Sequence, residues 1–261
     1  MSKDDIVRRD SLSELRKLSG WFRARHGLTI TLLGGWAVYS YNPYLGSFDI
    51  DCVGPADPFT LYLNLYMKEN GYVLEPESPF GAAAELWKKP IYKGDTWIAD
   101  ISIDACDFEY RNFFKEDPSK AIPYALCSQR QFLNYREIDG EYFWVPIKEL
   151  LFLYKTKAAR DRQYLMAHET LPSSYVELFT GKIDKDHSDL IALLDPKYGA
   201  MDGSILGDLI RRYDLSFITE TISNLPGQRS VVEYALTRQI DATEIRRWAE
   251  KILLDSDIEN K

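Results

Sequence analysis

The feature that most restricts what this chain can fold into is the segment 32–53, which combines a glycine turn with closely spaced acids. The β-branched and leucine-rich run 29–33 predicts a strand that stops at Gly34 and Gly35. Helix-compatible residues follow directly at 36–39. A glycine pair at a helix start lets the backbone approach a phosphate closely, and the N–H groups of the first helical turn favour an anion. This half of the segment therefore predicts a phosphate-binding turn.

The second half of the segment supplies carboxylates. Residues 47–53 alternate so that Asp49 and Asp51 lie on the same face of an expected strand. Their Cβ atoms would be about 6–7 Å apart, so both side chains could reach a hard divalent cation. A third carboxylate is expected on the neighbouring strand, with Asp100 as the candidate and Asp104 as the runner-up. We therefore expect Asp49, Asp51 and Asp100 to hold magnesium, with two ions.

Nucleotidyl transfer requires this combination of groups. In this reaction, metal ions held by carboxylates bind the triphosphate, and backbone donors bind the leaving phosphates. A hydroxyl group of the acceptor attacks the nucleotide phosphate. We assign phosphate contacts to Gly34, Gly35 and Ser47, although a glycine turn, a strand-end serine and an acidic strand face also occur for purely structural reasons. No Walker, Gly-x-Ser-x-Gly or Ser-x-x-Lys sequence is present, which weakens P-loop and hydrolase alternatives.

The rest of the chain predicts an α+β fold in two parts. Residues 1–145 mix strands with helices and are expected to form the catalytic domain, whereas residues 146–261 are expected to form a helical domain that closes the nucleotide cleft. Helices are expected at 11–25, beginning with a capping box at Ser11 and Glu14 and ending near Gly27, and at 58–69, 147–167, 184–194, 203–213, 215–223, 228–239 and 241–254, and a further strand at 98–103.

The segments 32–38 and 47–51 resemble the signature of DNA polymerase beta-type nucleotidyltransferases, in which a glycine pair precedes Asp-x-Asp. The resemblance covers about residues 28–104 and implies a nucleotidyltransferase fold, an NTP substrate and transfer of a nucleoside monophosphate. Many relatives carry an arginine four residues before the first aspartate. Leu45 occupies that place here, which puts the nucleotide preference in doubt more than metal binding.

The second half is similar to a narrower group, the AbiEii-like minimal nucleotidyltransferases. Lys155 lies in a helical run with Arg162, and the sequence Lys-Asp-His-Ser-Asp follows with Asp186 and Asp189. The resemblance implies that Lys155, Asp186 and Asp189 contact the nucleotide, although charged helix faces are usually solvated. AbiEii-like proteins are commonly toxins with an antitoxin partner, and other relatives are aminoglycoside adenylyltransferases.

Composition limits the class of acceptor and the cellular location that we expect. Forty acidic against 32 basic residues give a net charge of −8, which disfavours broad adhesion to a polyanion but permits a local basic patch. Three widely spaced cysteines predict neither disulfides nor thiolate zinc, the histidines lack zinc-ligand spacing, and no apolar run could span a bilayer. We expect a cytoplasmic protein that does not contact membranes. RNA or protein is the leading acceptor, a small hydroxyl compound the second, and a catalytically inactive nucleotide sensor the third alternative.

Overall fold

The computed structural model describes residues 2–56, 59–74 and 85–257, and the chain divides into two compact units. Unit 1 comprises Met1–Tyr110 and Pro123–Ile147, and unit 2 comprises Arg111–Ile122 and Lys148–Lys261. The sequence-based boundary at residue 145 assigns the segment Arg111–Ile122 to the first domain, whereas its contacts place it with the helices of unit 2.

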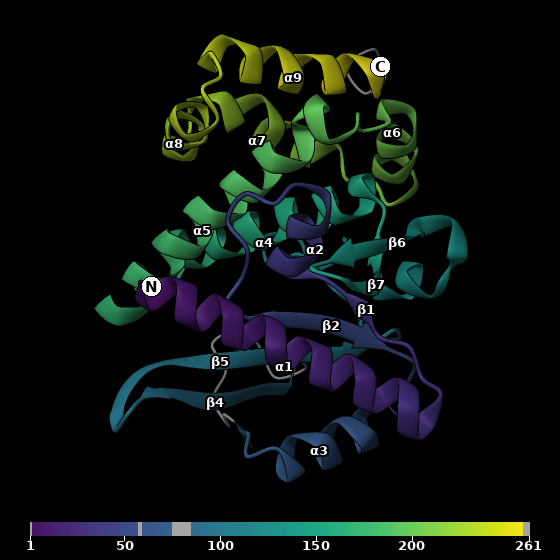
Figure 1. Cartoon of the computed structure of the whole chain (residues 1–261). Helices are drawn as coiled ribbons and strands as arrows, with labels where there is room; N and C mark the ends of the chain where they lie inside the picture. The colour runs from purple at the N-terminus through teal and green to yellow at the C-terminus, as the bar shows by residue number, and fades with distance from the viewer. Residues whose placement is uncertain (1, 57–58, 75–84, 258–261) are drawn as a thin grey trace. The chain divides into compact units, whose positions relative to one another are not determined.

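Unit 1 is built on a seven-stranded mixed sheet (Figure 1). In their order across the sheet, the strands are β3 (Val73–Leu74), β4 (Glu85–Lys93), β5 (Thr96–Asp107), β2 (Ile50–Gly54), β1 (Thr31–Leu32), β7 (Glu141–Pro146) and β6 (Leu133–Ile138). β2 is parallel to β5 and β1 is parallel to β7, whereas the other neighbouring pairs are antiparallel. The helices of this unit are α1 (Lys3–His26), α2 (Gly34–Tyr41) and α3 (Phe59–Glu69), with the short 3₁₀ segments η1 (Tyr124–Ser128) and η2 (Arg130–Phe132).

Helix α1 begins earlier than the sequence pattern predicts. Its N-terminal cap is Ser2, whose Oγ accepts a hydrogen bond from the Asp5 N–H while the Asp5 carboxylate accepts one from the Ser2 N–H. The predicted capping box at Ser11 and Glu14 is therefore wrong, because both residues lie inside the helix and are buried. The expected end is confirmed, since Gly27 closes the helix in the left-handed conformation.

The two faces of the central sheet differ in polarity. Ile50 and Cys52 on β2 lie opposite Ile103 and Ala105 on β5, and all four side chains are buried. Helix α1 covers this apolar face, because its Glu14 pairs with Lys89 of β4 at 3.1 Å and α1 contacts β5 (Figure 1). Alternation along the strands places the acidic residues of β2 and β5 on the opposite face.

Unit 2 is helical, as predicted. It contains α4 (Lys148–His168), α5 (Ser173–Leu194), α6 (Gly203–Arg212), α7 (Thr219–Asn224), α8 (Arg229–Arg238) and α9 (Ala242–Asp255), joined by η3 (Pro196–Tyr198), η4 (Ser216–Ile218) and η5 (Leu225–Gly227). Helix α5 begins eleven residues before the expected start at 184, and the predicted helix 215–223 is η4 followed by α7. The predicted helix 58–69 corresponds to α3, and its expected first residue, Pro58, lies outside the described residues.

Contacts of Phe114 and Glu116 explain why Arg111–Ile122 belongs to unit 2. The Phe114 ring is buried and meets the Phe217 ring edge to face, with centroids 5.0 Å apart. Glu116 accepts two hydrogen bonds from Arg160 of α4, at 2.5 and 2.7 Å. These contacts join residues that are far apart in the sequence, so no local sequence pattern predicts them. The chain therefore has an α+β fold with a helical C-terminal part, and none of the helices in its described part is long and apolar enough to cross a bilayer.

Candidate active site

The glycine turn and the acidic strand meet directly. The Leu33 N–H donates to the Asp51 carbonyl oxygen at 2.8 Å, immediately before the chain turns at Gly34. Gly34 has a φ of +59°, in the left-handed region that favours glycine. A Cβ atom at Gly34 would lie 1.6 Å from Oδ2 of Asp51, so only a glycine leaves room for this carboxylate. The two sequence signals thus converge on one place in unit 1.

Helix α2 starts at this turn without a side-chain cap. Leu33 occupies the cap position and makes no side-chain hydrogen bond to the helix, and no acidic residue lies in the first turn. The first N–H groups of an α-helix have no partner within the helix, and the helix dipole adds partial positive charge there. The Gly34 and Gly35 end of α2 can therefore bind an anion such as a phosphate.

The register between β2 and β5 determines which acid accompanies Asp51. Asp51 lies directly opposite Asp104, and their side chains point to the same face of the sheet. Asp100 lies four residues earlier on β5, about 13 Å along the strand, and its carboxylate accepts a hydrogen bond from Trp97 Nε1 at 3.0 Å. The runner-up Asp104, rather than Asp100, is the third acid that the strand pairing places beside Asp51.

Asp49 and Ser47 precede β2. Asp49 lies one residue before the strand and is partly exposed, whereas Ser47 is buried at 5% exposure. Leu45, at the place where many relatives carry arginine, is partly exposed in the same connection. The residues predicted in this part of the chain thus lie on one continuous segment that leads into Asp51.

Three neighbours of the acids were not predicted as site residues. Burial, with the charges of Asp51 and Asp104, raises the pKa of the Cys52 thiol. Burial raises the pKa of Cys106, with a further contribution from Asp104, and burial raises that of Tyr124 well above its ordinary value, with contributions from Cys106, Asp104 and Asp51. Cys106 lies two residues after Asp104 on β5. Tyr124 comes from η1, and no local sequence pattern indicates that it lies near these acids. The acids therefore lie among groups that stay protonated at neutral pH.

The donor set fits magnesium by its chemistry, with oxygen ligands from hard carboxylates. Within the described ranges, no group of three or more His, Cys, Asp or Glu side chains is arranged to hold a metal ion by itself. Magnesium in proteins is usually held by one or two carboxylates together with substrate phosphates, so an incomplete protein cage suits a nucleotide-dependent ion. Asp51 and Asp104, which lie opposite each other on β2 and β5, fit such a partial set.

The three residues predicted in the helical part form one cluster inside unit 2. Lys155 of α4 pairs with Asp186 at 3.0 Å and Asp189 at 2.7 Å, both on α5. Arg162 also pairs with Asp186, and Lys185 pairs with Asp189 at 2.9 Å. Asp186 and Asp189 are at most 4% exposed, and Lys155 is 8% exposed. Burial would raise the pKa of Asp186, but Arg162, Lys155 and Lys185 outweigh it and hold that pKa below its ordinary value. The cluster therefore pairs three basic side chains with two carboxylates, and the basic neighbours favour the charged form of Asp186.

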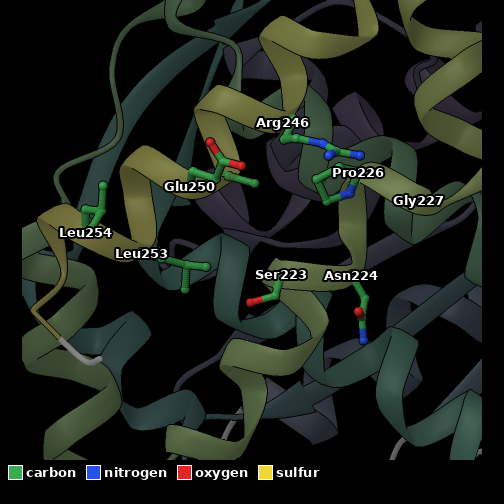
Figure 2. Close-up of a pocket in the computed structure, with 9 residues that line it drawn as sticks. Ser223, Asn224, Pro226, Gly227, Arg246, Glu250, Leu253 and Leu254 are labelled. Atoms are coloured by element: carbon green, nitrogen blue, oxygen red, sulfur yellow. The ribbon is translucent and has the colours of Figure 1, made fainter. Parts of the chain in front are cut away.

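A hollow of about 600 Å³ opens between α9, α7 and η5, within unit 2. Figure 2 shows Arg246, Glu250 and Leu253 on the α9 side and Ser223 and Asn224 across from them. None of the predicted site residues lines this hollow.

Comparison with known proteins places the fold. No family model matches the chain, and no curated protein matches it. Among solved structures, a putative nucleotidyltransferase from H. pylori is similar over 96% of both chains, with 14% identity and a TM-score of 0.50. A lincosamide antibiotic adenylyltransferase bound to lincomycin matches 70% of this chain and 96% of its own, with 16% identity and a TM-score of 0.41. An antigenic nucleotidyltransferase-like protein from Paracoccidioides brasiliensis matches 83% and 91%, with 14% identity and a TM-score of 0.39. The similarity to the H. pylori protein shows a shared fold along nearly the whole chain.

Proposed function

We propose that this protein is a magnesium-dependent nucleotidyltransferase that transfers a nucleoside monophosphate from an NTP to a hydroxyl acceptor. The observation that carries the proposal is the fit of the Asp51 carboxylate against Gly34 at the start of α2. It brings an anion-binding helix end and a metal-binding acid to one place, which is the arrangement that nucleotidyl transfer needs. The fold shared with a putative nucleotidyltransferase agrees with this assignment.

Magnesium would be held by Asp49 and Asp51, with Asp104 favoured over Asp100 as a third ligand because it lies opposite Asp51. When bound, the ion would neutralise phosphate charge and increase the reactivity of the α-phosphate.

The glycine turn would bind the phosphates of the NTP through the N–H groups of Gly34 and Gly35, with Ser47 as a further donor. The acceptor oxygen attacks the α-phosphorus, the bond between that phosphorus and the bridging oxygen to the β-phosphate breaks, and pyrophosphate leaves with the bonding electrons. The hydroxyl proton passes to a carboxylate, for which Asp104 is favoured over Asp100 because Asp104 lies opposite Asp51.

We further propose that the Lys155 cluster serves the nucleotide. Asp186 and Asp189 hold the Lys155 ammonium in a fixed orientation, and the basic side chains of the cluster suit a polyphosphate. In this proposal the two acids act on the nucleotide through Lys155.

For the acceptor, an AbiEii-like toxin acting on RNA or protein is the first proposal, with an antitoxin as partner and the cytoplasm as its location. A small hydroxyl compound of the aminoglycoside type is the second.

The test is incorporation of each α-labelled NTP in the presence of magnesium, with cell RNA, total protein and small hydroxyl compounds offered as acceptors. The D49N/D51N double variant should fold, as judged by circular dichroism, and lose incorporation and pyrophosphate release. Full activity in that variant contradicts the mechanism. Nucleotide binding by the unmodified protein without any incorporation favours an inactive sensor instead.

A further inference from the structure

A second candidate site lies entirely within unit 2. A cavity of about 270 Å³ is walled by side chains of α4, α5 and α7 together with Glu116 and Gln228. One of its residues is His187, which is only 2% exposed and whose Nδ1 atom has no hydrogen-bond partner within the described part of the chain. The Nδ1 atom itself is inaccessible to solvent, so His187 forms a buried part of the wall, and the polar groups that an occupant can reach belong to its neighbours.

The charges at the cavity argue against an anionic ligand. Arg160 already donates two hydrogen bonds to Glu116, at 2.5 and 2.7 Å, and one to Thr221 Oγ1 at 2.8 Å, and its guanidinium lies 3.6 Å from Glu220. The guanidinium is therefore neutralised, and two carboxylates line the same cavity. A phosphate or carboxylate group would meet net negative charge here.

The carboxamides and the aromatic pair of the lining suit a flat, hydrogen-bonding molecule. Gln163, Asn224 and Gln228 contribute carboxamides, each of which can donate and accept at a fixed spacing. Tyr164 and His168 are stacked with ring centroids 4.2 Å apart, which gives the wall a flat aromatic surface. A carboxamide can form a pair of hydrogen bonds with the edge of a nucleobase, and an aromatic ring can stack on the face of the base. The volume lies just below the range of drug-sized ligand pockets, which suits a single base.

The charge of His187 and the orientation of Asn224 are both compatible with a neutral, hydrogen-bonding molecule in the cavity. Burial lowers the pKa of His187 and outweighs the opposing effect of Asp186 and Asp184, so this imidazole adds no positive charge to the cavity wall at pH 7. Asn224 lines both this cavity and the neighbouring hollow, and Figure 2 shows its carboxamide pointing away from Arg246 and Pro226.

We propose that this cavity binds an uncharged nucleobase, with the carboxamides of Gln163 and Asn224 as hydrogen-bond partners and Tyr164 as part of the stacking surface. The site uses residues of the helical unit alone and needs neither metal nor triphosphate, so it is independent of the proposed nucleotidyl transfer. The base can be supplied by a free nucleoside or by the unpaired end of an RNA chain.

The experiment is calorimetric titration of the full chain, without metal, with adenosine, guanosine, cytidine and uridine. At least one nucleoside should bind, and N224A should weaken that binding at least tenfold. R246A is the matched control, since Arg246 lines the neighbouring hollow and not this cavity, and its replacement should leave affinity unchanged. No binding of any nucleoside at millimolar concentration, equal binding of ribose alone, or unchanged affinity in N224A would overturn the proposal.

Further variants keep the result interpretable. Q163A should also weaken binding, and it provides a second test because Gln163 is an exposed carboxamide of the same cavity whose replacement should not affect folding. A D51N variant should bind the nucleoside normally, which separates this site from the proposed active site. Competition by short single-stranded RNA against the bound nucleoside identifies an RNA end as the source, and its absence identifies the free nucleoside.

Discussion

The carboxylate of Asp51 lies directly against the backbone of Gly34, because a Cβ atom on Gly34 would be 1.6 Å from Oδ2 of Asp51. The contact couples the helix start to the acidic strand. Any substitution at Gly34 must move the carboxylate or the turn.

The Gly34→Ala variant should be destabilised and inactive. The left-handed φ of +59° costs alanine about 1–2 kcal/mol, and displacement of the Asp51 carboxylate adds to that loss. Gly94 is a matched control, since its φ is +61° and a Cβ atom there would meet nothing within 4 Å. Urea denaturation should show a clearly larger loss for G34A than for G94A, and equal losses would mean that the contact with Asp51 is unimportant.

A double-mutant cycle isolates this contact. In a D51G background the Asp51 side chain is absent, so G34A should cost no more than G94A does. A G34A penalty that persists in full in the D51G background would show that backbone strain at the turn is its sole cause.

The pairing of β2 with β5 predicts different roles for Asp104 and Asp100. D104N should lower nucleotidyl transfer by about 10²-fold or more, because it removes an acid directly opposite Asp51. D100N should have less than a tenfold effect, because Asp100 lies far along the strand and is bound by Trp97. Single-turnover rates at saturating NTP measure the two effects, and the reverse order would restore Asp100 as the third acid.

The success and failure of sequence interpretation follow from the range of the interactions involved. The Gly34 turn and the strand of Asp51 lie within twenty residues, so local glycine and alternation signals were enough to predict them. The choice between Asp104 and Asp100 depends on the register of two strands separated by about fifty residues, which no local pattern fixes.

The same reasoning applies to the parts that were missed. Strands β4, β6 and β7 were not predicted, and β4 carries Pro90 in its interior, which argues against a strand. The contacts of Phe114 and Glu116 with unit 2 are long-range and gave no signal. Lys155, Asp186 and Asp189 were predicted to bind nucleotide from a family resemblance, and the structure adds that they bind one another.

The thiols should be unreactive in the folded protein. Cys52 and Cys127 are about 1% exposed, and the pKa values of Cys52 and Cys106 are raised mainly by burial, so little thiolate exists at pH 8. Reaction with an aromatic disulfide reagent should be slow for the native chain and should reach three thiols per chain in guanidinium chloride. Rapid native reaction of any thiol would contradict the burial of these strands.

The buried network predicts a pH-dependent loss of stability in Asp186→Asn. The substitution removes the acid shared by Lys155 and Arg162 from a buried cluster, which should cost about 3–5 kcal/mol at pH 7. D184N is the control, since Asp184 lies on the same helix and is more exposed.

The sign of the pH effect follows from the lowered pKa of Asp186 in the folded state. A carboxyl group with a depressed folded pKa contributes its full stability above its unfolded pKa and loses it as pH falls toward the folded value. The difference between the unmodified chain and D186N should therefore stay constant above about pH 5 and shrink below it. Urea titrations at pH 7, 5 and 4 measure this trend. A difference that grows on acidification would mean that Asp186 is protonated in the folded protein and that the ionised network does not exist.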